Sequence, residues 1–80
     1  MAFERLCLDA VKHEVSTKHG LKIEPWFEFG TMWCDRIDED VADTVARAIV
    51  DFCKDGTTVG KTVMKPTKLE PWYQWAFDII

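Results

Sequence analysis

The sequence lacks any apolar run near the roughly 20 residues that a membrane-spanning helix needs. Its start, Met1 to Arg5, contains neither the basic nor the apolar region of a signal peptide. We therefore expect a cytoplasmic protein with no membrane contact. The three cysteines, Cys7, Cys34 and Cys53, are far apart and odd in number. This pattern argues against a disulfide framework and for reduced thiols.

Metal-binding and catalytic signatures are scarce as well. His13 and His19 are six positions apart, which places them on different sides of a helix, and no two cysteines are separated by two residues. A thiol enzyme using Cys34 or Cys53 would need a nearby glycine turn for an oxyanion and a third orienting group, and the sequence shows neither. We therefore expect no metal, no cofactor and no enzymatic activity.

One stretch, Gly56 to Thr62, resembles a phosphate-binding P-loop only superficially. The P-loop places four residues between its glycines and lies between a strand and a helix. Here three residues separate Gly56 from Gly60, and the expected order is helix before and strand after. We interpret the stretch as a turn that leads into a strand.

What the chain does contain is a large apolar and aromatic share. Its 80 residues are 48% hydrophobic and include ten aromatic side chains, enough for one compact domain over residues 1–80. The net charge of −4 disfavours nonspecific binding to nucleic acid or anionic lipid. The same charge is compatible with a partner that has a basic surface.

Two similar stretches, Lys22 to Phe29 and Lys68 to Trp75, organise the chain. Each places Lys, Glu, Pro and Trp in the same register, with apolar residues substituted by similar ones. Alternation predicts strands over 21–29 and 69–80, with one apolar face and one polar face that includes a tryptophan. The second copy has a helical alternative, because Glu70, Gln74 and Asp78 also share one helical face.

Helical periodicity marks two other segments. From Phe3 to Lys18, six apolar residues recur on one face, and Gly20 follows where a left-handed cap needs glycine. Asp38 is a predicted N-cap for a second helix that ends at 55–56. The expected buried faces comprise Phe3, Leu6, Cys7, Ala10, Val11 and Val15, and then Val41, Val45, Ala48, Ile49 and Phe52.

The remaining segments complete a small α+β fold. Thr31 to Ile37 is predicted to pair with the first copy through a turn at Gly30, and Thr57 to Met64 is predicted as a further strand. The order is α-β-β-α-β-β, with two amphipathic helices on one face of an antiparallel sheet of three to four strands. Because proline lacks an amide hydrogen, Pro25 and Pro71 predict that both copies lie at sheet edges.

The four tryptophans are expected to have two roles. Trp33 and Trp75 are predicted core residues, as large aromatics in small domains usually are. Trp26 and Trp72 alternate with the apolar rows, so they are either exposed anchors for a partner or core residues under the helices. The sequence leaves these two alternatives open.

The charged residues suggest one binding surface. The run from Asp35 to Asp43 is either an ordinary solvated helix start or part of an anionic patch. A weaker alternative is nucleic-acid binding through Lys54, Lys61, Lys65 and Lys68. The predicted partner-binding residues are Trp26, Trp72, Glu24, Glu28, Glu70, Asp35, Asp38, Glu39, Asp40 and Asp43.

The functional prediction is a small, acidic, non-enzymatic module that binds a larger protein with a basic surface, as an inhibitor or adaptor. Small acidic chains without catalytic motifs are typical of phage and mobile-element proteins that disable nucleic-acid machines, anti-CRISPR proteins included. Carboxylates can occupy positions where phosphates would otherwise bind. The alternative is a self-associating structural or accessory protein, such as a homodimer, that uses its edge strands and exposed tryptophans.

Overall fold

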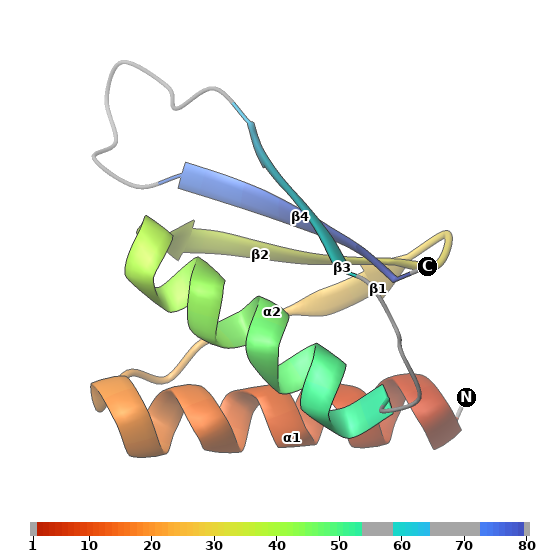
Figure 1. Cartoon of the computed structure of the whole chain (residues 1–80), viewed down its shortest axis with the longest axis horizontal. Helices are drawn as coiled ribbons and strands as arrows, with labels where there is room; N and C mark the ends of the chain where they lie inside the picture. Colours follow the sequence, from red (N-terminus) through yellow and green to blue (C-terminus); the bar gives the residue numbers. More distant parts are fainter. Residues whose placement is uncertain (1, 54–58, 65–72, 80) are drawn as a thin grey trace.

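A computed structural model describes residues 2–53, 59–64 and 73–79. Two helices and a four-stranded antiparallel sheet confirm the predicted α+β class and element order (Figure 1). The strands are arranged β1-β2-β4-β3, and both helices lie on the same side of the sheet. The elements are α1 (Ala2–His19), β1 (Trp26–Glu28), β2 (Thr31–Ile37), α2 (Glu39–Cys53), β3 (Val59–Met64) and β4 (Tyr73–Ile79).

Helix α1 ends as predicted, but its buried face is narrower. Gly20 has a φ of +66° and its amide donates to the Ser16 carbonyl at 3.0 Å, which closes the helix with a left-handed cap. Cys7, Val11 and Val15 are fully buried. Phe3 and Leu6, predicted on the same face, are instead exposed at 47% and 56%, because they lie at the side of the apolar stripe.

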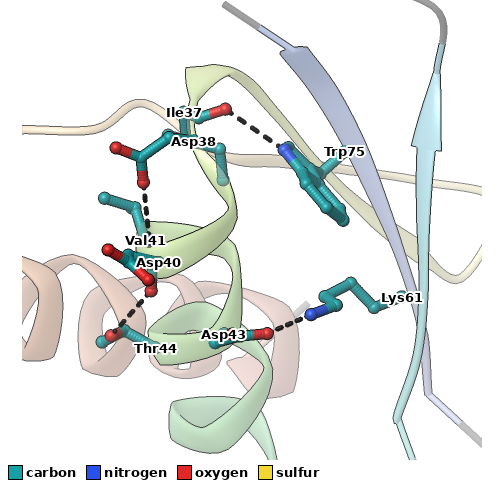
Figure 2. A network of polar contacts seen from close by, with 8 residues as sticks. All are labelled: Ile37, Asp38, Asp40, Val41, Asp43, Thr44, Lys61 and Trp75. Atoms are coloured by element: carbon teal, nitrogen blue, oxygen red, sulfur yellow. Dashed lines mark hydrogen bonds and ion pairs between the residues drawn. The ribbon is translucent and has the colours of Figure 1, made fainter.

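Helix α2 begins at the predicted cap. The Val41 amide donates to Asp38 Oδ1, and the Ala42 amide donates to the Asp38 carbonyl, both at 2.9 Å (Figure 2). The carboxylate thereby satisfies one of the amides that the first helical turn leaves without a partner. The predicted apolar face is confirmed, with Val41, Val45, Ala48 and Ile49 buried and Phe52 packed against the core.

Asp38→Ala is expected to lower the free energy of unfolding by about 1 kcal/mol, since it removes the acceptor of the Val41 amide. The measurement is urea unfolding followed by circular dichroism. Glu39→Ala is the matched control, because Glu39 is exposed and adds only dipole stabilisation. Equal losses in the two variants would show that charge, rather than the cap, stabilises this end.

The core lies between the helices and the inner face of the sheet, defined here as the face directed at α1 and α2. Met32, Cys34, Trp75 and Phe77 belong to this face and are buried. α2 contacts α1 and strands β2, β3 and β4, so it forms the middle of the packing. The ring of Phe3 on α1 lies between β1 and α2. Its centroid is 6.5 Å from the ring centroid of Phe27 and 5.7 Å from that of Phe52.

The first Pro-Trp copy forms a shorter strand than predicted. Only Trp26–Glu28 pairs with β2, whereas residues 21–25 connect α1 to the sheet without strand structure. Pro25 immediately precedes β1 and lacks the amide hydrogen that would extend the ladder. The predicted edge position of this copy is confirmed, because β1 is the first strand of the sheet order.

The described part of the second copy, which begins at Tyr73, is a strand, so the helical alternative is wrong for this part. β4 pairs with β2 on one side and β3 on the other. The predicted edge position is therefore wrong, because β4 is interior. Its described ladder starts at Tyr73, after Pro71 in the sequence, so this proline does not interrupt it. Residues 65–72, which include Glu70 and Trp72, lie outside the described residues.

β3 confirms the strand predicted over Thr57–Met64, whose first two residues lie outside the described part of the chain. The same holds for the turn expected at Gly56. Lys61 of β3 pairs with Phe77 of β4 and therefore shares its inner face. A charge directed inward on an edge strand opposes the addition of further strands to that edge.

Candidate protein-binding face

The strand register defines an outer face of the sheet, on the side opposite the helices. Residues that pair across antiparallel strands point to the same side, and their immediate neighbours point to the other. Trp26 pairs with Trp33, Trp33 with Ala76, and Ala76 with Thr62, which forms one row across all four strands. The next row comprises Glu28, Thr31, Asp78 and Gly60.

Two tryptophans form an apolar pair on the β1–β2 side of the outer face. Trp26 and Trp33 are directly opposite each other, and both are half-buried. Trp33 was expected in the core, and this expectation is wrong, because it follows buried Met32 and precedes buried Cys34 and therefore points away from them. Trp75 is a core residue as predicted, at 5% exposure. For Trp26, the structure favours the partly exposed alternative over the core one.

Three exposed carboxylates surround this pair. Glu28 and Asp78 belong to the row on one side, and Asp35 lies beyond Trp33 on the other. The Thr31 hydroxyl donates to Asp78 Oδ1 at 2.7 Å, and Gln74 Nε2 donates to Asp35 Oδ1 at 2.6 Å.

Asp78 is the member of this group that the sequence prediction missed. Alternation would have revealed it, because Asp78 follows the buried Phe77 and therefore belongs to the other face.

The turn before β2 holds a residue in an unfavourable backbone conformation. Phe29 and Gly30 form a two-residue loop between the paired Glu28 and Thr31, with φ values of 52° and 79°. Positive φ at both positions is the pattern of a type I′ turn, in which Asn or Gly is strongly preferred at the first position. Phe29 occupies that position and is fully exposed, at 102%. The prediction of a turn at Gly30 is thus confirmed. Alternation in the strand predicted over 21–29 assigns Phe29 to the apolar face, and this assignment is wrong, because Phe29 belongs to the turn.

The end of β2 has a second unfavourable backbone conformation. Arg36 has a φ of 63° at a bulge, where two residues of β2 lie opposite Gln74 alone. The extra residue returns Ile37 to the inner face, although it is three positions from Cys34. Trp75 Nε1 donates to the Ile37 carbonyl at 3.1 Å and holds the strand end in place (Figure 2).

A third unfavourable feature lies between Phe29 and Arg36 in the chain, at Trp33. The indole Nε1–H of Trp33 is buried and has no hydrogen-bond partner among the described residues. A buried unpaired N–H costs roughly 1–3 kcal/mol. β2 and its preceding turn thus contain two left-handed non-glycine residues and one unpaired indole.

The other predicted acidic residues are not part of the outer face. Asp38, Glu39, Asp40 and Asp43 lie at the start of α2, on the helical side of the sheet. Asp38 caps the helix, and Asp43 forms an ion pair with Lys61 (Figure 2). Glu24 is exposed and is 3.7 Å from the Lys12 amino group of α1. The predicted single anionic patch is therefore divided among three places.

Of the four lysines predicted as a basic cluster, only Lys61 is among the described residues. Lys61 is exposed, and its amino group contacts Asp43 and lies 5.4 Å from the centroid of the Trp75 ring. Lys54, Lys65 and Lys68 lie outside the described residues. The four described strands contain two basic residues, Lys61 and Arg36. The outer face thus has an acidic excess.

The cysteines are free, and Cys7 and Cys34 are fully buried. Burial raises the pKa of the Cys7 thiol to about 11, with a smaller contribution from Cys53, and that of Cys34 to about 12, with a smaller contribution from Asp35. The pKa of Cys53 is also raised by burial. Because the thiolate is the nucleophilic form, these environments oppose thiol catalysis near neutral pH.

A hollow with a volume of about 850 Å³ lies on the helical side. It is lined by residues of both charges, including Lys18, Arg47, Asp40 and Asp51. His19 Nε2 and Thr44 Oγ1 are 2.7 Å apart within it. Among the residues that the structure describes, no three histidine, cysteine or carboxylate side chains are grouped so that they could hold a metal ion.

Comparison with family models, with curated proteins and with solved structures gave no match for this chain. Neither α1 nor α2 combines the length and the apolar character that crossing a membrane requires.

Proposed function

We propose that this protein is a non-enzymatic binding module that docks its outer face on a basic surface of a larger protein. The observation that supports this proposal most is the clustering of unfavourable features in β2 and the turn before it, at Phe29, Trp33 and Arg36. Unpaired polar groups and strained residues gather at functional sites, where stability is not the only constraint. The aromatic and acidic side chains of the same face define its chemistry.

The tryptophan pair supplies the apolar part of the contact. Tryptophan is enriched among the residues that dominate binding energies. Such residues contribute most where surrounding groups exclude water from the contact. Trp26 of the edge strand β1 and Trp33 of β2 are adjacent on the outer face, between rows that contain Glu28 and Asp35. This arrangement resembles the apolar centre and polar rim of known interfaces.

The carboxylates define the partner's charge. Three acidic side chains, Glu28, Asp35 and Asp78, would meet arginine or lysine, and such complementarity increases association rates and specificity. A basic surface that normally binds nucleic acid meets this requirement. We therefore retain an inhibitor or adaptor of the phage or mobile-element type, anti-CRISPR proteins included, as the specific form of the proposal. It predicts that nucleic acid competes with this protein for the partner.

Glu28→Gln with Asp78→Asn is expected to weaken partner binding about tenfold, because two carboxylates lose their charge while their shape is kept. The partner is isolated by affinity capture from host lysate, and its affinity for each variant is measured by calorimetry. Added nucleic acid should reduce the binding of the wild-type chain.

Glu39→Gln with Asp40→Asn is the matched control, since it removes the same charge from the start of α2. We expect a change of less than about twofold. A larger loss in this control than in the outer-face variant would move the interface to α2. Absence of any specific partner would overturn the proposal.

Self-association through the sheet edges is the second candidate. It is favoured by the edge position of β1, where no described strand pairs with its outer side, and by Trp26 on that strand. The acidic outer face opposes it, because two copies would place like charges together. Light scattering distinguishes the candidates: a monomer at micromolar concentration removes self-association, whereas a dimer that Trp26→Ala dissociates would support it.

A further inference from the structure

We propose that Phe29 is the anchor of the interface and inserts into an apolar pocket of the partner, with arginine or lysine at the pocket rim. This inference rests on the proposed function and specifies the partner's surface. Phe29 lies at the tip of the β1–β2 hairpin, next to the outer face, and projects from the described part of the fold.

The backbone provides the first argument. A two-residue hairpin loop with positive φ at both positions is best served by Asn-Gly, since a phenylalanine side chain clashes with the backbone in the left-handed region. The chain therefore retains an aromatic residue where the turn itself disfavours one. Backbone strain of this kind is typical of binding sites.

Burial provides the second argument. Phe3 is also partly exposed, but its ring contacts Phe27 and Phe52 and so contributes to packing. Phe29 is 102% exposed, and no ring contact is present for it within residues 2–53, 59–64 and 73–79. Its side chain thus adds little to the stability of the described fold while exposing a full aromatic surface to solvent.

The surrounding charge defines the pocket. Glu28 precedes Phe29 in the chain, and Asp78 lies in the same cross-strand row, bonded through Thr31. The row ends at Gly60, which adds no side chain beside Asp78. An aromatic ring beside two exposed carboxylates is complementary to an apolar pocket with a cationic rim.

Phe29→Asn separates stability from binding. We expect it to raise the melting temperature by about 3–6 °C, because asparagine relieves the left-handed strain. We expect the same variant to weaken the captured partner's binding at least tenfold, since the anchor is lost. Leu6→Asn is the control: Leu6 is 56% exposed on α1 and belongs to neither the hairpin nor the outer face, so its replacement should leave affinity unchanged.

Photocrosslinking locates the pocket. With benzoylphenylalanine at position 29, the purified partner should be labelled at apolar residues next to arginine or lysine, and at position 6 it should not. If Phe29→Asn kept its affinity for the partner while Glu28→Gln/Asp78→Asn lost affinity, the role of Phe29 as anchor would be overturned and the proposed function would stand. Full affinity in both variants would overturn the function as well. A lower melting temperature for Phe29→Asn would contradict the strain argument.

Discussion

Trp75→Ala is expected to lower the free energy of unfolding by about 3–5 kcal/mol, the range for removing a large buried aromatic side chain. Trp75 is 5% exposed on the inner face of the interior strand β4. Its ring lies below the Lys61 amino group, and its Nε1 bonds the Ile37 carbonyl. At roughly 0.05–0.15 kcal/mol per residue, a chain of this length has little margin for such a loss.

Urea unfolding followed by far-ultraviolet circular dichroism measures this effect. Trp75→Phe is the graded control, because it keeps most of the apolar volume and removes the donor to Ile37. We expect it to cost about 1–3 kcal/mol. Trp26→Ala should cost less than Trp75→Ala, since Trp26 is half-buried at the edge of the sheet. Equal costs for Trp26→Ala and Trp75→Ala would place Trp26 in the core and contradict its proposed role.

Alkaline pH is expected to destabilise the protein through its buried thiols. The pKa values of Cys7 and Cys34 are about 11 and 12 in the folded chain, against an ordinary value of 9.0. Above pH 9 the unfolded chain releases these protons and the folded chain retains them. The contribution of these two thiols to the free energy of unfolding is therefore fully present below pH 9 and is lost as pH rises toward 11–12. At pH 10 the loss is about 1 kcal/mol for each thiol.

The measurement is the free energy of unfolding at pH 8 and pH 10. Cys34→Ala is the control: it lowers stability at both values, but its difference between them should be smaller by about 1 kcal/mol. Other groups titrate equally in both proteins and cancel in this comparison. An identical pH difference in both proteins would show that Cys34 is not protected by burial.

Local sequence patterns predicted most of the fold, for identifiable reasons. The 3.6-residue periodicity that ends at Gly20 and restarts after Asp38 is a property of the segments themselves, and both helices were confirmed. Alternation in the segment that became β4 likewise placed Trp75 and Phe77 on one face. Such patterns reflect burial on one side of an element, which is independent of where that element lies.

The candidate face was only partly predictable, because it depends on pairing between distant segments. Glu28, Asp35 and Trp26 were selected from the sequence, but Asp78 and Trp33 join them only through the register of β4 and β1 with β2. The acidic residues at the start of α2 were selected for the same charge and lie on the other side of the sheet. A run of charged residues in a sequence does not indicate on which side of the sheet those residues will lie.

The sequence by itself determined the two helices, their caps, the strand segments and the acidic, aromatic character of the chain, because neighbours along the chain decide these properties. Only the tertiary structure decided that β4, which includes the described end of the second copy, is interior, that Arg36 occupies a bulge and that Phe29 lies at positive φ. The physical reason is that strand order and register arise from contacts between segments up to 47 residues apart, such as Thr31 with Asp78.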